Sequence, residues 1–226
     1  MNRPPVVDRL SALLRRAARQ QRLTAVLLYA PLALIAIGWA NGVQGRDSIL
    51  ALNETVSGSA LPGAVFGLIT GLVLAQGAAW CGARFGWARA LEDEFAAALG
   101  PLRRGDVFWL ALWSALGEEF LFRGAMQPAW GWLASTLLFA LCHVPLRRSL
   151  WPWTVMALAA GAVLGGLFEL LGTLWAPLVA HFVVNLRGCE RLRTRPVSRR
   201  PVAAGAAVGD GVADGRYRYF GDDEQL

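Results

Sequence analysis

The polar residues that could carry out chemistry lie inside apolar segments of the chain. Glu118 and Glu119 are adjacent in one such segment, and His143 and His181, the only two histidines, lie in two others. A charged side chain at the centre of a membrane helix costs about 2.5–3.5 kcal/mol on insertion scales, so such residues need partners and usually have a function. Carboxylates and imidazoles are common general acids and bases. The sequence therefore indicates acid–base chemistry within apolar helices.

Helical spacing pairs several of these residues. Glu119 and Arg123 are four residues apart, so they are expected to share a helix face and form an ion pair. His181 and Asn185 have the same spacing. Glu118 points to a different face and must find a partner on another helix. A single buried histidine is usually a satisfied core residue, but two of two in apolar helices, together with Asn185 and the glutamate pair, favour a functional site.

Six apolar blocks are expected to position these residues. Of the 226 residues, 55% are hydrophobic and 17% are charged, and about 20 apolar residues are enough for one membrane-spanning helix. The blocks cover residues 23–42, 61–81, 107–127, 130–144, 153–171 and 173–186. The sequence therefore predicts an all-α fold, a polytopic membrane helical bundle of about six transmembrane helices with interfacial amphipathic helices.

The arginines predict how the bundle is oriented. The N-terminal arm, the loop 82–105, the turn at Arg147 and Arg148, and the segment after Arg187 are rich in arginine, whereas the intervening loops carry only Arg46. Under the positive-inside rule, this alternation predicts a multi-pass protein of the bacterial inner membrane with both termini in the cytoplasm. The formal net charge of +6 is explained by this orientation, and no nucleic acid is expected as a partner.

Depth in the membrane limits which residues can meet. At a rise of about 1.5 Å per residue, Glu118 and His181 fall near the middle of their helices, whereas His143 and Asn185 lie nearer the cytoplasmic ends. The mismatch for His143 is about 8 Å on untilted helices, and the usual tilts of about 20° can accommodate it. A common site is therefore expected only if the helices tilt or the site lies in the cytoplasmic half of the bundle.

The segments outside the blocks are polar or amphipathic. Residues 6–23 alternate apolar residues and arginines at helical spacing, which predicts a basic amphipathic arm (1–22) lying along the membrane, although a frayed tail fits nearly as well. Residues 87–99 place an apolar residue at every fourth position, which predicts an interfacial helix with a packing role. Residues 188–226 are too polar for a core and predict a disordered cytoplasmic tail. Residues 23–187 remain as the transmembrane domain.

Three short motifs resemble those of one family of intramembrane proteases. The segment EEFLFRG, which begins at Glu118, resembles the E-E-x-x-x-R motif of that family. Phe139 and His143 look like its F-x-x-x-H motif, and His181 and Asn185 look like its H-x-x-x-N motif. The motifs follow in the family's order between about residues 107 and 187. On these residues the chain is similar to the CPBP family (CAAX protease and bacteriocin processing), which includes type II CAAX endopeptidases.

The resemblance implies an intramembrane endopeptidase that uses a glutamate-activated water. It implies that Glu118 is the general base and that His143 positions and activates the water. It also implies that His181 and Asn185 stabilise the developing oxyanion. The supporting residues would be Glu119, Arg123 and Phe139. The expected partners are the lipid bilayer and a peptide or membrane-associated protein substrate, whereas substrate identity and oligomeric state are not indicated by the sequence.

Other mechanisms and functions stay open on these residues. No cofactor is expected, but zinc is the alternative, with Glu118, His143 and His181 as its ligands. The sequence has no H-E-x-x-H motif and no third histidine, and the resemblance favours a metal-free mechanism. A non-catalytic membrane scaffold or immunity protein is a second function, and a small proton-coupled transporter is a third.

Overall fold

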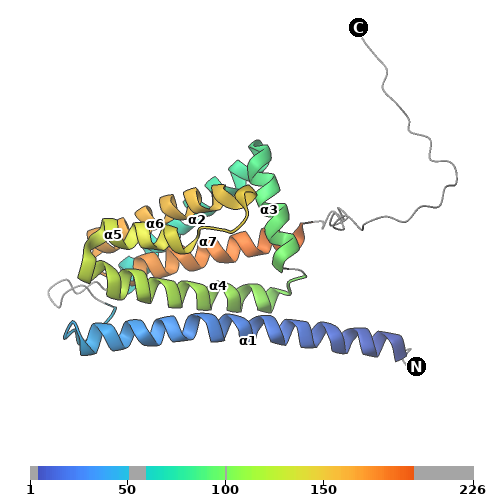
Figure 1. The fold of residues 1–226 in the computed structure, drawn as a ribbon, viewed down its shortest axis with the longest axis horizontal. Helices are drawn as coiled ribbons and strands as arrows, with labels where there is room; N and C mark the ends of the chain where they lie inside the picture. The colour runs from blue at the N-terminus through green and yellow to red at the C-terminus, as the bar shows by residue number, and fades with distance from the viewer. Residues whose placement is uncertain (1–4, 51–59, 100, 196–226) are drawn as a thin grey trace, which may run out of the picture.

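A computed structural model describes residues 5–50, 60–99 and 101–195, with side chains from residue 21 onward apart from that of Ser149. Every element in these ranges is a helix (Figure 1), which confirms the all-α prediction. The elements are α1 (Pro5–Gly42), α2 (Ala60–Arg84), α3 (Gly86–Leu99), α4 (Arg104–Glu119), the π-helix η1 (Phe120–Met126), α5 (Gln127–Cys142), the 3₁₀ helix η2 (Arg148–Leu150), α6 (Trp151–Leu171) and α7 (Trp175–Thr194).

Three helical segments of the described residues are long and apolar enough to cross a membrane. They are Gln21–Gly42 within α1, the whole of α2 and the whole of α6. The helices that carry the candidate site residues do not meet this standard, because α4 and α5 have 16 residues each and α7 is interrupted by polar residues. The chain is therefore a membrane protein, as predicted, whereas six crossings stay a prediction.

The first helix joins two segments that the sequence analysis treated as separate, the basic arm (1–22) and the first apolar block (23–42). α1 continues without a break from Pro5 to Gly42, and Pro31 lies inside it. At about 1.5 Å per residue, a helix of this length spans about 57 Å, nearly twice the hydrocarbon core of about 30 Å. The predicted boundary after residue 22 therefore marks where the apolar part begins and not where a helix ends.

The predicted tail also begins as helix. α7 extends to Thr194, so residues 188–194 were wrongly assigned to a disordered segment, and residues 196–226 lie outside the described residues. The extension has a physical cause in the acidic face of α3, the amphipathic helix that the sequence predicted. Arg195 pairs there with Glu92 and, at 2.7 Å, with Asp93. Arg191 lies 3.5 Å from Glu92.

Small residues bring α2 and α7 close together. A Cβ atom on Gly67 would lie 2.3 Å from the carbonyl oxygen of Ala176, and one on Gly71 would lie 2.7 Å from that of Ala180. Glycine at every fourth position lets membrane helices approach backbone to backbone. The two helices run side by side in the same direction (Figure 1), and this contact sets the position of α7.

The segment η1 joins α4 to α5 with a wider helical turn. A π-helical turn shifts backbone hydrogen bonds out of the α-helical pattern and is often found at functional sites. Side chains from elsewhere bind three carbonyl groups of η1. Ser135 Oγ donates to Phe122 at 2.7 Å, Arg46 Nη1 donates to Gly124 at 2.5 Å, and Gln44 Nε2 donates to Ala125 at 2.7 Å. The segment after α1 therefore holds η1 in place.

The chain turns back at Gly131 and not in the gap at residues 128–129 between the predicted blocks 107–127 and 130–144. Gly131 has a φ of +83°, a conformation that glycine adopts readily and other residues rarely do. Pro128 lies in a helix that continues from η1 without a break, and the carbonyl oxygen of Gly124, four residues earlier, accepts a hydrogen bond from Arg46 in place of the N–H that proline lacks. The residues after Gly131 then run back toward His143, which caps α5.

Candidate active site

The predicted site residues come from four elements that meet in the bundle. Glu118 and Glu119 form the end of α4, Arg123 lies in η1, Phe139 and His143 lie at the end of α5, and His181 and Asn185 lie in α7. Most of these side chains are buried, and those of His143 and Asn185 are partly buried. Both glutamates are among the buried residues, with 8% of Glu118 and none of Glu119 exposed. The structure thus brings together residues from α4, α5 and α7.

Glu119 is the centre of a buried hydrogen-bond network. Its Oε1 atom accepts hydrogen bonds from Arg123 Nη1 at 2.9 Å and from His181 Nδ1 at 2.6 Å. Arg123 also donates from Nη2 to the carbonyl oxygen of Gly161 at 3.0 Å, and its guanidinium carbon lies 4.4 Å from the centre of the Phe139 ring. This network links α4, η1, α6 and α7. A buried charge needs such partners, because leaving one unpaired is costly.

Glu118 has different surroundings. Its Oε2 atom is buried and has no hydrogen-bond partner among the described residues. It lies 3.7 Å from His143 Nε2 and 3.9 Å from His181 Nε2. Both distances exceed a direct hydrogen bond, and contacts of this length between polar atoms are commonly bridged by water. Glu118 therefore shares a small polar space with the two imidazoles.

The hydrogen bonds of the two histidines fix how their rings face Glu118. His143 Nδ1 lies 2.7 Å from the carbonyl oxygen of Phe139. A carbonyl oxygen only accepts hydrogen bonds, so Nδ1 carries the proton and Nε2 of the neutral ring keeps a free lone pair. His181 is held by Glu119 through Nδ1 in the same manner. The Phe139 ring lies 4.5 Å from the His143 ring and 6.2 Å from the His181 ring, between centroids, and so packs against both.

Asn185 is held near this space by a residue that the sequence analysis missed. Its Nδ2 atom donates to Ser114 Oγ at 2.9 Å, and Ser114 Oγ donates to the carbonyl oxygen of Ala111 at 3.2 Å. Its described hydrogen bond thus goes to Ser114, and not to Glu118 or to a histidine. Ser114 precedes Glu118 by one helical turn in an apolar block, and this spacing was the signal that could have identified it.

A tyrosine on α1 also reaches the candidate base. The Tyr29 side chain interacts electrostatically with Glu118. Gly117 permits the approach, because a Cβ atom there would lie 2.6 Å from the backbone oxygen of Tyr29. Tyr29 stands far from the motifs in the sequence and belongs to an ordinary apolar helix. No local pattern could have marked it as part of the site.

The described residues contain no group of three His, Cys, Asp or Glu side chains arranged to hold a metal ion. The zinc ligands considered from the sequence were Glu118, His143 and His181. Glu118 Oε2 lies 3.7 Å from His143 Nε2 and 3.9 Å from His181 Nε2. Adjacent ligand atoms of tetrahedral zinc are closer, at about 3.4 Å. Zinc therefore stays an alternative for experiment.

Comparison with known proteins agrees with the motifs. Residues 103–187 match the family model described as type II CAAX prenyl endopeptidase Rce1-like. The uncharacterized protein YpbD of Bacillus subtilis (strain 168) is 33% identical over 93 residues, which cover 41% of this chain and 49% of YpbD. The match thus spans about half the length of that relative. No solved structure matches the chain. The resemblance drawn from the motifs is confirmed as a match of one segment: residues 103–187, which contain every predicted site residue, are similar to the Rce1-like family of type II CAAX prenyl endopeptidases.

Proposed function

We propose that this protein is an intramembrane endopeptidase that hydrolyses a peptide bond with a water activated by Glu118. One observation carries the proposal. The unpartnered Oε2 atom of Glu118 lies 3.7 Å from His143 Nε2 and 3.9 Å from His181 Nε2, a spacing that suits one shared water molecule. The family of residues 103–187 supports the same reaction.

Glu118 acts in both halves of the reaction, first as a base and then as an acid, and the other polar groups each have one role. Glu118 takes a proton from the water. His143 Nε2 accepts a hydrogen bond from the second O–H group of the same water and so orients the water. The resulting hydroxide attacks the peptide carbonyl. His181, in its protonated form, donates from Nε2 to the oxyanion, and Asn185 donates the amide hydrogen that Ser114 does not bind. Glu118 then passes its proton to the leaving amine.

The network around Glu119 supports this chemistry and does not take part in it. Glu119 and Arg123 orient His181, because Glu119 Oε1 binds both Arg123 and the Nδ1 atom of His181. Phe139 fills the space between the two imidazole rings and the guanidinium. Positioning a catalytic imidazole through its second nitrogen is a recurrent device in hydrolases.

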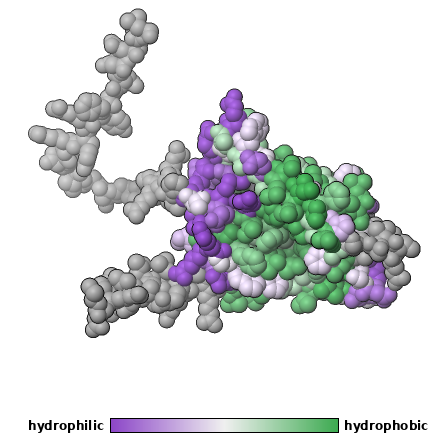
Figure 2. All heavy atoms as spheres, turned by 180° about the vertical axis from the view of Figure 1, so that it is seen from behind, coloured by the Kyte–Doolittle hydropathy of each residue, from purple (hydrophilic) through white to green (hydrophobic). Residues whose placement is uncertain are grey.

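The setting of the proposed reaction is the bacterial inner membrane. Figure 2 shows an apolar belt over the bundle and polar residues gathered at the end where α3 and the end of α7 lie. We assign this arginine-rich end and both termini to the cytoplasm, with six crossings. The substrate is a small protein or peptide, and no metal or other cofactor takes part.

A quenched-fluorescence peptide assay in proteoliposomes tests the proposal. The peptide panel includes prenylated CAAX peptides, because the family's name refers to them, next to unprenylated peptides. Wild type is expected to cut at least one peptide and to place ¹⁸O from labelled water in the new carboxyl group. Glu118→Gln is expected to be slower by a factor of about 10²–10⁴. Glu94→Gln on α3 makes the same substitution outside the site and should cleave at the wild-type rate.

The same preparations separate the alternatives. A scaffold or immunity protein predicts that Glu118→Gln leaves every phenotype unchanged. A transporter predicts a proton flux, dependent on Glu118, without any peptide cleavage. Zinc dependence predicts that 1,10-phenanthroline abolishes cleavage and that added zinc restores it. Cleavage by Glu118→Gln at the wild-type rate would contradict the proposed mechanism outright.

A further inference from the structure

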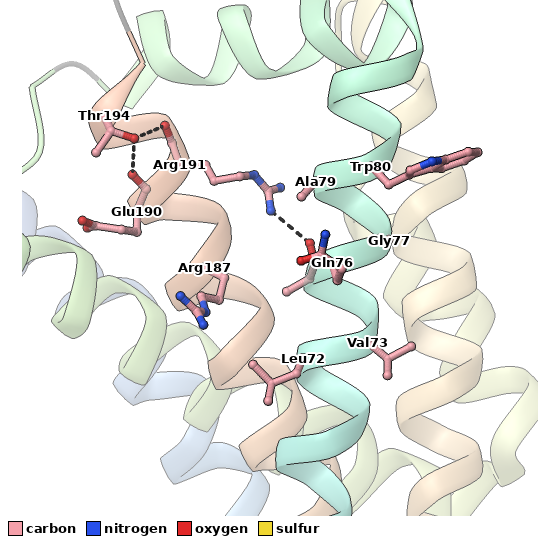
Figure 3. Close-up of a pocket in the computed structure, with 11 residues that line it drawn as sticks. Leu72, Val73, Gln76, Gly77, Ala79, Trp80, Arg187, Glu190, Arg191 and Thr194 are labelled. Carbon is pink, nitrogen blue, oxygen red and sulfur yellow. Dashed lines mark hydrogen bonds between the residues drawn. The ribbon is translucent and has the colours of Figure 1, made fainter.

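A groove opens between α2 and α7 beyond their close glycine contact. It has a volume of about 830 Å³, and Figure 3 shows the two helices separating around it. Its lining residues are Leu72, Val73, Ala75, Gln76, Gly77, Ala79, Trp80, Arg187, Glu190, Arg191 and Thr194. None of the candidate site residues is among them, so the groove is a separate feature of the molecule.

The groove has an apolar part and a cationic part in a fixed order along the membrane. Leu72 and Val73 are 41% and 65% exposed on α2, within a helix apolar enough to span a bilayer. Trp80, 58% exposed, stands two turns nearer the arginine-rich end. Arg191 projects from α7 toward α2 at that end (Figure 3), and Arg187 lines the groove one turn earlier in α7. Along the helix pair Leu72 and Val73 come first, Arg187 lies next, and Trp80 and Arg191 lie nearest the arginine-rich end (Figure 3). An apolar part followed by a cationic part with a tryptophan matches the acyl chain and the headgroup region of a lipid leaflet.

The arginines retain hydrogen-bonding capacity that faces the groove. Arg187 makes no ion pair or hydrogen bond with any residue that the structure describes. Arg191 donates from Nη1 to the carbonyl oxygen of Ala75 at 3.0 Å, and Nη2 lies 3.5 Å from Glu92. The Nε atom of Arg191 is buried without a partner among these residues. A planar guanidinium with free N–H groups is suited to a phosphate.

The acidic lining residue does not cancel this charge. Glu190 is bound by Arg193 at 2.8 and 2.5 Å, and its side chain points away from α2 in Figure 3. This pairing lowers the pKa of Glu190, chiefly through the hydrogen bond from Arg193, so its carboxylate stays charged and paired. The groove is thus left with the positive charge of Arg187 and part of that of Arg191.

We propose that this groove is a binding site for one anionic phospholipid. Its phosphate lies between Arg187 and Arg191, and an acyl chain follows Leu72 and Val73 along α2. A phospholipid satisfies both parts of the groove, because it joins a phosphate at the membrane surface to a long apolar chain below it. The bound lipid closes the gap at the end of the α2–α7 pair and so steadies the helix that carries His181.

Native mass spectrometry of the purified full-length protein tests this site by comparing phosphatidylglycerol with phosphatidylcholine. Wild type is expected to retain one phosphatidylglycerol in preference to phosphatidylcholine. Arg187→Gln should weaken phosphatidylglycerol binding by about fivefold, the factor typical of one arginine near an anionic surface, and leave phosphatidylcholine binding unchanged. Arg187 makes no described contact, so its replacement should not disturb the fold, and a melting curve in phosphatidylcholine micelles checks this.

Two further variants make the test specific. Arg148→Gln removes an exposed arginine at the same end of the bundle but outside the groove, and it should bind phosphatidylglycerol as wild type does. Val73→Trp fills the apolar part and should weaken binding of phosphatidylglycerol while both arginines remain. The proposal is overturned if Arg187→Gln binds phosphatidylglycerol like wild type, or if Arg148→Gln weakens it equally. It is also overturned if Arg187→Gln changes only the KM for peptides with a free C-terminal carboxylate.

Discussion

Glu118 and Glu119 are neighbours on α4, yet their two surroundings differ in almost every respect. Oε1 of Glu119 binds a guanidinium at 2.9 Å and an imidazole at 2.6 Å, whereas its Oε2, like that of Glu118, is buried without a partner among the described residues. Around Glu118 an oxygen without a partner faces two imidazole nitrogens at 3.7 and 3.9 Å. The hydrogen bonds to Arg123 and His181 hold the Glu119 carboxylate in place, whereas the distances from Glu118 to the two imidazole nitrogens leave room for a bridging water. The comparison supports our proposal that Glu119 has a structural role and Glu118 a chemical one.

The largest expected effect is the loss of activity in Glu118→Gln with little loss of stability. The amide keeps the size of the side chain but cannot take the proton, so cleavage should slow by a factor of about 10²–10⁴. The melting temperature in detergent should stay close to that of wild type, because no described hydrogen bond to Oε2 is broken. A variant that unfolds early would remove the distinction between the two glutamates.

Glu119→Gln should show the opposite combination. It removes the negative charge that neutralises the buried Arg123, and breaking a buried pair in this way typically costs about 3–5 kcal/mol. Thermal or denaturant unfolding in detergent measures this loss. The double variant Glu119→Gln with Arg123→Met removes the stranded positive charge and should regain much of the stability, but it should not regain activity, because His181 remains without its carboxylate. If the double variant is less stable than Glu119→Gln alone, the stranded charge was not the cause.

Ser114→Ala tests the side of the site that holds Asn185. The substitution removes the hydroxyl that accepts the Asn185 hydrogen bond at 2.9 Å, and an unpaired partly buried amide costs about 1–3 kcal/mol. We expect kcat to fall by about tenfold, since about 1.4 kcal/mol corresponds to that factor, while KM changes little. Ser114→Thr keeps the hydroxyl and should restore most of the rate. An unchanged kcat in Ser114→Ala would place Asn185 outside the reaction.

The sequence could indicate these residues but not their pairing. Fixed spacing along one helix predicted the ion pair of Glu119 with Arg123, and the structure contains it at 2.9 Å. The hydrogen bond from His181 to Glu119 depends on how α7 is rotated against α4. That rotation is set by backbone contacts of Gly67 and Gly71 with α7, between segments far apart in the chain. Local periodicity carries no information on such contacts.

The same reasoning explains the errors in the fold. The blocks predicted a turn at residues 128–129, but the helix continues past Pro128, where Arg46 binds the Gly124 carbonyl oxygen, and the chain turns at Gly131, which has a positive φ. The π-helix η1 was not foreseen, since its stability comes from distant donors such as Arg46 and Gln44. The helical end of α7 depends on the acidic face of α3. In each case a partner from another element decided the local structure.

Tyr29→Phe should have the smallest effect on cleavage, but it is the most selective test of the difference between Glu118 and Glu119. The hydroxyl interacts with Glu118 and not with Glu119, so its removal should alter the reacting carboxylate without loosening the network beside it. One hydrogen-bonding group typically contributes about 0.5–1.5 kcal/mol, so we expect cleavage to change by about two- to tenfold, with an unchanged melting temperature. The pH–rate profile should shift as well, because the phenol faces the proposed base. Tyr29→Phe in a Glu118→Gln background should have no further effect on residual cleavage. An equal effect in both backgrounds would mean that Tyr29 acts on packing against Gly117 and not on Glu118.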